Sequence, residues 1–495
     1  MKRTGQLLAH LTCSALFEMK GRSIFLKWKG ILIFIPIVGA FTILKGAEVM
    51  IKKNVAIISG KTAGKLSRLL GHHGSTLPGV VAIKIDPNII RKLSHQIKHF
   101  IFITGTNGKT TTSNLLAHLL RSTGMKIVNN FEGANMMSGV AACLINNTTI
   151  LGQLKYDYAV LEIDEASLPA ILKQITPQML IITNFFRDQL DRYGEIDMLI
   201  KDIEKAIHPI ETKMILNADD PFVFRLSSLN KNNIYYGLGK RAYAFGDYGT
   251  SESKYCPMCG DEMLYEHIHF NQLGFFSCSC GFERPTPHYE IDRIQSNPIT
   301  FSMKSGTYQM KMTGTYNVYN ALAAITCATE LGIQDKNIKD SLLNFHLANG
   351  RMDLFFYKGF PYIVNLNKNP SGMNVSISEI LSTHYEKQIV YFINDSIADG
   401  KDVSWIWDID FECLQREDIQ RIICSGTRAS DITLRLKYAG IDPNKVIKIP
   451  SIEKAIQYAF SHPMPTYLLP TYTALLEVKN HTERSIKKEN ESCTL

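Results

Sequence analysis

The most constraining feature of the sequence is the segment GTNGKTTT at positions 105–112. It directly follows an apolar stretch, HFIFIT at 99–104, and it opens a helix-like stretch at 111–124. Glycines let backbone N–H groups approach phosphate oxygens, and a helix N-terminus adds a favourable dipole. The segment therefore predicts a phosphate-binding loop between a buried strand and a helix.

The residues of this loop indicate how a nucleotide would be held. We expect Lys109 to reach the β- and γ-phosphates and the Thr110 hydroxyl to hold Mg²⁺. Ile103 stands where the full phosphate-loop pattern has its first glycine, so the motif is the shortened GxxGKT. A chance glycine-rich turn is the alternative interpretation. The loop residues expected to bind ATP are Thr106, Asn107, Gly108, Lys109, Thr110 and Thr111.

A Mg²⁺-nucleotide site also needs a carboxylate near the phosphates, because Mg²⁺ prefers oxygen ligands. The segment VLEIDEAS at 160–167 supplies Glu162, Asp164 and Glu165. Glu162 ends an apolar stretch and is our first choice as a direct or water-mediated magnesium ligand. An exposed carboxylate at a strand end is the alternative.

Strand-like and helix-length segments alternate along the chain, with strands expected at 157–163, 180–184 and 213–221. This alternation predicts βαβ units and a parallel sheet. The pattern starts again at Leu354 and predicts a second, smaller α/β domain. We divide the chain into an N-terminal extension, an ATP-binding middle domain, a C-terminal α/β domain and a polar, disordered tail. Their bounds are 1–49, 50–350, 351–478 and 479–495.

The N-terminal extension contains an apolar run of 14 residues at 31–44. This run is shorter than the ~20 residues that span a bilayer. It could be a membrane-associated anchor, a buried or loosely attached hairpin, or an extension outside the folded enzyme. Because a plausible soluble start follows at Met50, we favour the third interpretation.

Four of the ten cysteines lie close together: Cys256, Cys259, Cys278 and Cys280. The C-x₂-C and C-x-C pairs are separated by 18 residues, a spacing that suits a tetrahedral structural Zn²⁺. Four thiolates leave no open position on the metal, so we expect it to stabilise an inserted ribbon at about 250–285. Four independent cysteines, or a zinc ribbon that binds nucleic acid, are the alternatives.

Composition narrows the class of protein. With 45% hydrophobic and 20% charged residues, the chain is neither disordered, fibrous nor a polytopic membrane protein. The net charge of +8 is too small to indicate nucleic-acid binding. Clustered cysteines favour a reducing compartment, so we expect a cytoplasmic location and leave contact with the inner face of the membrane open.

Six segments occur in the order and spacing of the Mur ligases: GTNGKTTT, LEIDEAS, TNFFRDQLDRYGE, LNADDP, GTYNVYNALAA and GRMD. Over roughly residues 98–480 the chain resembles this family of ATP-dependent ligases, which activate a carboxylate as an acyl phosphate. The resemblance implies phosphate and Mg²⁺ contacts for Asn107, Lys109 and Thr110, and it makes Glu162 the metal carboxylate. It also implies an adenine contact for Asn320 and a nucleotide contact for Arg351.

The chain departs from the family pattern at four positions. Gln189 replaces a histidine that is found in the members that add an amino acid. Tyr316 stands at the histidine of their GxHN segment, which reads GTYN in this chain. Between the domains, Asn365 stands where an aspartate is usual and Lys368 where a histidine is usual. The N-terminal UDP-binding domain of about ninety residues is also missing. We therefore expect no UDP-linked substrate held in the usual way.

The cysteine insertion and three segments of the second domain are similar to one subgroup, MurT, the ligase-like subunit of lipid II isoglutaminyl synthase. These segments are at 365–374, 393–412 and 425–431. The resemblance implies ATP-dependent amidation of the α-carboxyl of D-glutamate in the lipid II stem peptide, in peptidoglycan synthesis. Ammonia would come from a GatD-type glutaminase subunit in a heterodimer. In agreement, the sequence has no glutaminase-type nucleophile segment.

The resemblance also implies an essential aspartate, Asp399, at the subunit interface, where it orients the partner's histidine. Asp402, in the same loop, is the alternative. Two other functions stay open: a stand-alone Mur or folylpolyglutamate-type peptide ligase, and a non-enzymatic nucleotide-binding regulator.

Overall fold

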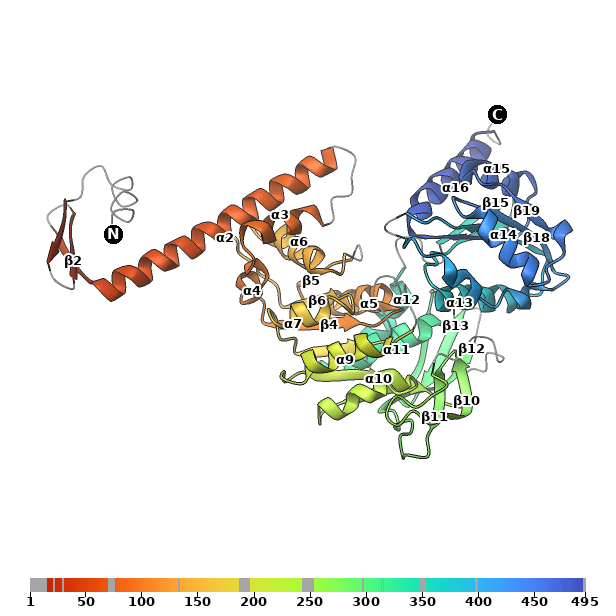
Figure 1. The fold of residues 1–495 in the computed structure, drawn as a ribbon, viewed down its shortest axis with the longest axis horizontal. Helices are drawn as coiled ribbons and strands as arrows, with labels where there is room; N and C mark the ends of the chain where they lie inside the picture. The colour runs from red at the N-terminus through yellow and green to blue at the C-terminus, as the bar shows by residue number, and fades with distance from the viewer. Residues whose placement is uncertain are drawn as a thin grey trace.

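The computed structural model contains two α/β bodies and a long helix that leads to a small N-terminal sheet (Figure 1). It describes residues 16–20, 23–28, 31–69, 76–131, 134–186, 196–242, 253–295, 298–312, 314, 316–346, 353–396 and 399–492. Of residues 16–49, 270 and 488–492 it describes the backbone alone.

A nine-stranded sheet forms the centre of the first body. In spatial order its strands are β14 (Gly306–Met310), β13 (Ile299–Met303), β12 (Tyr289–Gln295), β9 (Ile234–Leu238), β8 (Lys213–Asn217), β7 (Met179–Ile182), β4 (His99–Thr104), β6 (Tyr158–Glu162) and β5 (Ile127–Asn129). The strands from β5 to β12 pair in parallel, and β13 and β14 extend the sheet antiparallel. The predicted parallel sheet is confirmed.

Helices cover both faces of this sheet because strand residues alternate between two apolar cores. Ile101 and Ile103 of β4 point into one core and Phe100 and Phe102 into the other. The first core contains α5 (Lys109–Ser122), α11 (Tyr316–Glu330) and α12 (Asp335–Asn344). The second includes residues of α2 (Ile37–Leu69), α3 (Leu77–Ile85), α4 (Ile89–Ser94), α6 (Met137–Asn147), α7 (Leu168–Leu172), α9 (Ile196–Ile207), α10 (Pro221–Arg225) and η1 (Leu226–Leu229).

The strand expected at 213–221 ends earlier, at Asn217. Asp220 ends the extended stretch because its carboxylate accepts hydrogen bonds from the backbone N–H groups of Phe222 and Val223 and so caps α10. Between β9 and β12 the chain forms a hairpin of β10 (Leu264–Phe270) and β11 (Leu273–Ser277), which carries the cysteine segments.

The second body is built on a six-stranded sheet. Its strands, in spatial order, are β15 (Asp353–Tyr357), β16 (Phe360–Val364), β20 (Thr466–Pro470), β17 (Lys387–Phe392), β18 (Ile419–Ser425) and β19 (Val446–Lys448). All pairs except β15 with β16 are parallel. One core includes residues of α13 (Pro370–Leu381), η2 (Ser404–Asp408), η3 (Phe411–Leu414) and α14 (Ala429–Tyr438); the other includes residues of α15 (Ile452–Ser461) and α16 (Tyr472–Ser492). η4 (Pro443–Lys445) leads into β19.

The expectation of a disordered tail after residue 478 is wrong, because α16 continues to Ser492. Thr482 is fully buried, and Ile486 packs against the core of the second body. The Lys479 ammonium forms an ion pair of 2.6 Å with Asp353. The polar composition of this segment gave no indication that one face of its helix packs on the second body.

At the N-terminus, β1 (Leu16–Lys20), β2 (Ser23–Trp28) and β3 (Ile31–Pro36) form an antiparallel sheet. The apolar run at 31–44 is divided between β3 and α2, and α2 continues through the boundary predicted at 49/50. That division of the chain stays a prediction. Within the described residues no helix combines the length and apolar character needed to cross a membrane.

Candidate active site

The predicted phosphate loop lies between the end of β4 and the start of α5. Gly105 and Gly108 adopt φ angles of 123° and 86°, a region that side-chain-bearing residues rarely enter. A Cβ atom on Gly108 would lie 2.0 Å from the Oδ1 atom of Asn320. Both glycines are therefore required by the backbone path of the loop.

The end of the neighbouring strand β7 holds this loop in place. The backbone N–H of Thr106 donates to the Asn184 carbonyl at 2.8 Å, and that of Asn107 donates to Asn184 Oδ1 at 2.9 Å. Thr183 Oγ1 donates to the Asn107 carbonyl at 2.8 Å, and the Phe186 N–H donates to Thr106 Oγ1 at 3.0 Å. Because hydrogen bonds fix both sides of the turn, the loop is preorganised.

Lys109 lies in the first turn of α5 and is buried. Its Nζ atom is 2.9 Å from Glu165 Oε2 and also donates to the carbonyls of Thr106, at 3.1 Å, and Gly105. Burial raises the pKa of Glu165, and the positive charge of Lys109 opposes that shift. The pair places a lysine ammonium directly under the phosphate loop.

Glu162 lies at the carboxyl end of β6, next to the strand that leads into the loop. Its Oε1 atom accepts from Asn135 Nδ2 at 2.7 Å, and its backbone N–H and carbonyl are both bound by the Asn130 side chain. Its Oε2 atom is buried and has no hydrogen-bond partner among the described residues. A buried carboxylate oxygen of this kind fits a cation ligand. The two asparagines, from the segment NNFEGAN, were not singled out from the sequence.

The other predicted nucleotide residues are placed as follows. Thr110 and Thr111 lie in the first turn of α5, and Thr111 is buried. Asn320 of α11 is buried beside Gly108, and its Nδ2 atom donates to Asn317 Oδ1 at 3.0 Å. Arg351 and Gln189 lie outside the described residues.

The second body contacts the loop directly. Asn369 caps α13 by accepting from the Gly372 N–H at 2.8 Å, and its Nδ2 atom donates to Asn107 Oδ1 at 3.2 Å. The positive charge of Lys368 acts on Glu165. The site therefore lies where the two bodies meet. Sequence reasoning found the segment at 365–374 but missed Asn369 as the contact.

Asp399 is buried in the second body. Its carboxylate accepts the backbone N–H of Thr473 at 2.8 Å and the Thr473 hydroxyl, so it caps the start of α16. The alternative residue, Asp402, accepts from the backbone N–H and the hydroxyl of Ser404 at 2.8 and 2.9 Å. Asp395 forms an ion pair of 2.9 Å with Arg428. All three carboxylates of this loop therefore form hydrogen bonds or ion pairs with residues of the second body.

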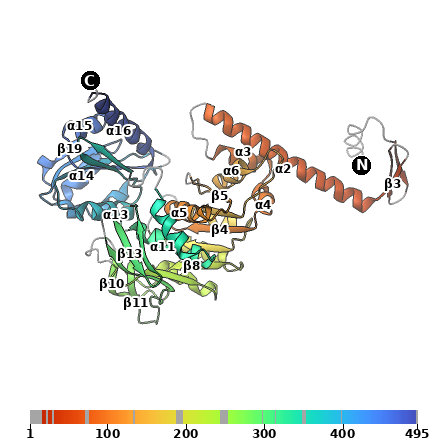
Figure 2. The same ribbon diagram turned by 180° about the vertical axis from the view of Figure 1, so that it is seen from behind.

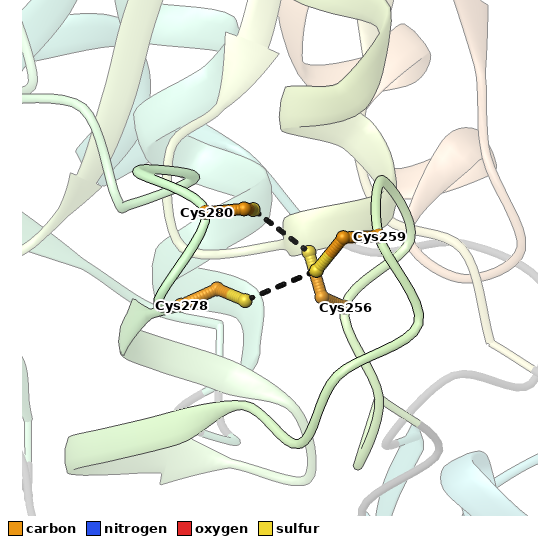
Figure 3. Close-up of side chains that lie close together, drawn as sticks. All are labelled: Cys256, Cys259, Cys278 and Cys280. Carbon is orange, nitrogen blue, oxygen red and sulfur yellow. Dashed lines mark hydrogen bonds between the residues drawn. The ribbon is translucent and has the colours of Figure 1, made fainter.

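The four predicted thiols come together at the base of the inserted hairpin (Figure 3). Their sulfur atoms all lie within 4.8 Å of one another. Cys256 Sγ is 3.8 Å from Cys280 Sγ, and Cys259 Sγ is 3.4 Å from Cys278 Sγ. Tetrahedral zinc with Zn–S bonds of about 2.3 Å requires S···S distances of about 3.8 Å. The cluster therefore fits a four-thiolate metal site.

Buried polar contacts attach this hairpin to the body that carries the phosphate loop. Arg284 Nε lies 2.6 Å from Asp219 Oδ1, and Tyr319 Oη donates to Asp219 Oδ2 at 2.7 Å. Gln272 Nε2 donates to the Phe185 carbonyl at 2.7 Å. Phe185 follows Asn184, which holds the loop. The hairpin that follows the first cysteine pair is thus hydrogen-bonded to a residue next to the one that holds the phosphate loop.

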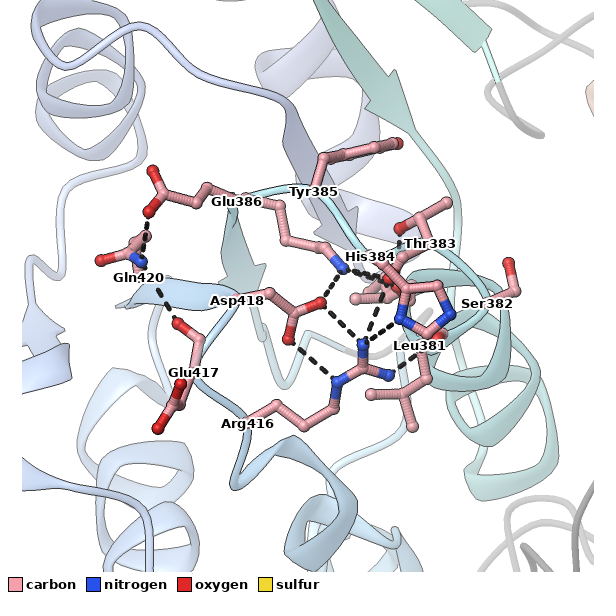
Figure 4. Close-up of polar contacts among 12 residues, drawn as sticks. Leu381, Ser382, Thr383, His384, Tyr385, Glu386, Arg416, Glu417, Asp418 and Gln420 are labelled. Carbon is pink, nitrogen blue, oxygen red and sulfur yellow. Dashed lines mark hydrogen bonds and ion pairs between the residues drawn. The ribbon is translucent and has the colours of Figure 1, made fainter.

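A second polar cluster lies at the opposite end of the C-terminal sheet, where β17 and β18 begin (Figure 4). Lys387 is fully buried, and its Nζ atom donates to the carbonyls of Ile380 and Thr383 and to Asp418. Arg416 forms an ion pair with the same aspartate at 2.8 Å. These cations satisfy the carbonyls at the end of α13, which is a stabilising role.

Comparison with known proteins shows which families share this architecture. The chain matches the family model described as Mur ligase middle domain over residues 103–328 and that described as MurT ligase C-terminal over residues 366–475. A pseudomurein peptide ligase type C from Methanothermus fervidus superimposes with a TM-score of 0.63 at 25% identity, covering 78% of this chain and 79% of that chain. The predicted Mur-ligase-type fold is confirmed.

Several relatives carry the name lipid II isoglutaminyl synthase (glutamine-hydrolyzing) subunit MurT. The relative from Staphylococcus aureus strain COL is 42% identical over 433 residues, which cover 87% of this chain and 98% of the relative. The relative from Streptococcus pneumoniae strain ATCC BAA-255 / R6 is 34% identical over 436 residues, which cover 87% and 96%. The chain therefore belongs to the MurT family.

Proposed function

We propose that this chain is the ATP-dependent ligase subunit of a lipid II isoglutaminyl synthase. It converts the α-carboxyl of D-glutamate in the lipid II stem peptide to the amide, D-isoglutamine, during peptidoglycan synthesis. The observation that carries the proposal is the match to the MurT relatives across both bodies of the chain. ATP is the energy source because a carboxylate resists attack by ammonia until one of its oxygens becomes a leaving group.

The residues at the loop support the first half-reaction. Backbone N–H groups and the start of α5 would bind the phosphates, as the loop geometry favours. Lys109 would exchange Glu165 for the γ-phosphate and offset the charge that develops on the transferred group. Glu162, held by Asn130 and Asn135, and Thr110 would hold Mg²⁺. When bound, the metal supplies charge neutralisation on the phosphates.

The second half-reaction needs a nitrogen source from outside the chain. We assign it to a GatD-type glutaminase subunit that forms a heterodimer with this chain, in keeping with the word subunit in the names of the relatives. Asp399 would orient the partner's catalytic histidine. Its position at the start of α16, fixed by Thr473, would give the carboxylate a defined direction.

The thiol cluster would hold Zn²⁺ through Cys256, Cys259, Cys278 and Cys280. The metal has a structural role in this proposal because four thiolates occupy every position of a tetrahedral ion. Its contribution is to keep the hairpin docked on the sheet. We further propose that the protein works in the cytoplasm, where thiols stay reduced.

The function is tested by incubating the chain with lipid II, ATP and Mg²⁺, with either ammonium chloride alone or glutamine plus the co-expressed partner. We expect amide formation and ADP from both nitrogen sources. Asp399→Asn keeps an oxygen acceptor for Thr473, and it should block the glutamine route alone. If it also blocks the ammonium route, Asp399 belongs to the ligase site. Coupling of a free amino acid without amidation would instead indicate a stand-alone ligase.

A further inference from the structure

The outward face of α2 carries an unusual stripe of exposed apolar side chains. Over the part of α2 whose side chains are described, these residues recur at helical spacing: Ile51, Val55, Ile58, Leu66 and Leu69. Their exposed fractions range from 46% to 83%. At 100° per residue they fall within one narrow sector of the helix. The five side chains therefore share one face of the helix, on which the exposed Thr62 separates Ile58 from Leu66.

The opposite side of α2 is packed against the body. Ala56 and Ile57 are fully buried, and Gly60 and Gly64 lie against Pro78 of α3. A Cβ atom on Gly60 would come within 2.7 Å of the Pro78 carbonyl oxygen, and one on Gly64 within 2.8 Å of the proline ring. This close packing fixes the rotation of α2 and directs the apolar stripe outward. Figures 1 and 2 show the helix extending beyond the body toward the small N-terminal sheet.

Basic residues lie beside the apolar stripe. Between positions 49 and 85 the sequence has six basic residues and no acidic residue. Lys65 and Arg68 lie on one flank of the stripe and Lys52 on the other, and all three are exposed. Over residues 50–69 every charged residue of α2 is basic. An exposed apolar face bordered by cations is typical of segments that lie in the interface of an anionic bilayer.

We propose that α2 docks this protein on a membrane surface rich in anionic lipid, with the apolar stripe in the acyl boundary and the flanking cations at the headgroups. The proposal rests on the proposed function, in which the substrate is lipid-linked. Docking would keep the middle body at the surface from which the stem peptide projects. Docking would give the chain a second ligand, anionic lipid, at a surface outside the ligase site.

A second copy of the chain is the other occupant that the spacing of the stripe would suit. Helix pairs of that kind usually carry both signs of charge at the flanking positions. Here both flanks are basic, so two copies would bring like charges together. Headgroup phosphates neutralise the same cations, and charge complementarity therefore favours the lipid surface.

The test measures co-sedimentation of the full chain, with its partner, on vesicles of equimolar phosphatidylglycerol and phosphatidylcholine and on vesicles of phosphatidylcholine alone. We expect binding to the anionic vesicles that weakens with salt. Each cation near an anionic surface contributes about fivefold in affinity, so Lys52→Gln/Lys65→Gln/Arg68→Gln should bind about a hundredfold more weakly. Ile58→Ser and Leu66→Ser should each lose about tenfold.

Matched substitutions in the second body serve as controls. Lys437→Gln/Lys448→Gln/Lys454→Gln removes three exposed cations and Leu354→Ser one exposed apolar side chain, and neither should change vesicle binding. Equal loss in the control and α2 variants would overturn the proposal. So would a stripe-dependent dimer in analytical ultracentrifugation with no vesicle binding.

An activity measurement separates this proposal from the proposed function. The α2 variants should slow amidation of lipid II in anionic vesicles and leave amidation of a lipid-free stem peptide unchanged. If wild-type chain binds the vesicles but amidates neither substrate, the docking surface stands and the proposed function fails. If it amidates both and binds no vesicles, the function stands and the docking proposal fails.

Discussion

Arg284→Met tests how the inserted hairpin is attached to the nucleotide-binding body. The side chain of Arg284 is 8% exposed and that of its partner Asp219 is fully buried. Methionine keeps the aliphatic stem but leaves the Asp219 carboxylate without its cation. Breaking a buried ion pair on one side costs about 3–5 kcal/mol. Because Tyr319 and the Leu238 N–H still donate to Asp219, we expect the lower end, about 3 kcal/mol.

The double variant Arg284→Met/Asp219→Asn provides the control. It removes both charges, so its loss of stability should be smaller than the sum of the two single losses, with a coupling of about 2 kcal/mol. Thermal unfolding of the three variants and the wild type, followed by calorimetry, measures the cycle. In a Trp28→Phe background the two remaining tryptophans, Trp405 and Trp407, lie in the second body, so the fluorescence transition should stay unchanged. Additive losses, or an Arg284→Met loss below about 1 kcal/mol, would refute a buried, coupled pair.

Three further predictions concern the metal sites and the second body. Glu162→Gln should lower ATP-dependent turnover by about a hundredfold or more and shift the Mg²⁺ titration to higher concentration; an unchanged titration would exclude Glu162 as a ligand. Cys256→Ser should reduce bound zinc, measured by atomic emission, and lower the melting temperature; full zinc content would contradict a four-thiolate site. Burial acts to raise the pKa of Asp418, but hydrogen bonds from Lys387 and Arg416 outweigh it and leave the pKa below the ordinary 3.8. Its stabilising effect is therefore complete above pH 3.8 and is lost as the pH falls through the lower folded-state pKa, and Asp418→Asn should remove that part of the acid dependence in equilibrium unfolding.

The phosphate loop and the thiol cluster could be predicted because their geometry is set locally. A strand, a glycine turn and a helix follow one another within a short stretch around Lys109, and the cysteine pairs each lie on one turn. The parallel sheet followed from the alternation of apolar segments. Such features depend on the order of residues along the chain, which the sequence displays directly.

Contacts between distant segments could not be predicted in the same way. Asn130 and Asn135 follow β5 and hold Glu162 at the end of β6, and Asn369 reaches Asn107 from the other body. The tail after residue 478 was misjudged for a similar reason, since its helix is stabilised by packing on a sheet formed far upstream. Polarity alone did not reveal that contact.

In the proposed reaction this chain activates a carboxylate with ATP before ammonia attacks. The most direct test uses lipid II with oxygen-18 in the α-carboxyl of D-glutamate, together with ATP, Mg²⁺ and ammonium chloride. If an acyl phosphate forms, one labelled oxygen moves to the released phosphate for each amide produced, and Lys109→Ala abolishes both products. Amide formation with unlabelled phosphate, or labelled phosphate released equally by Lys109→Ala, would contradict the account.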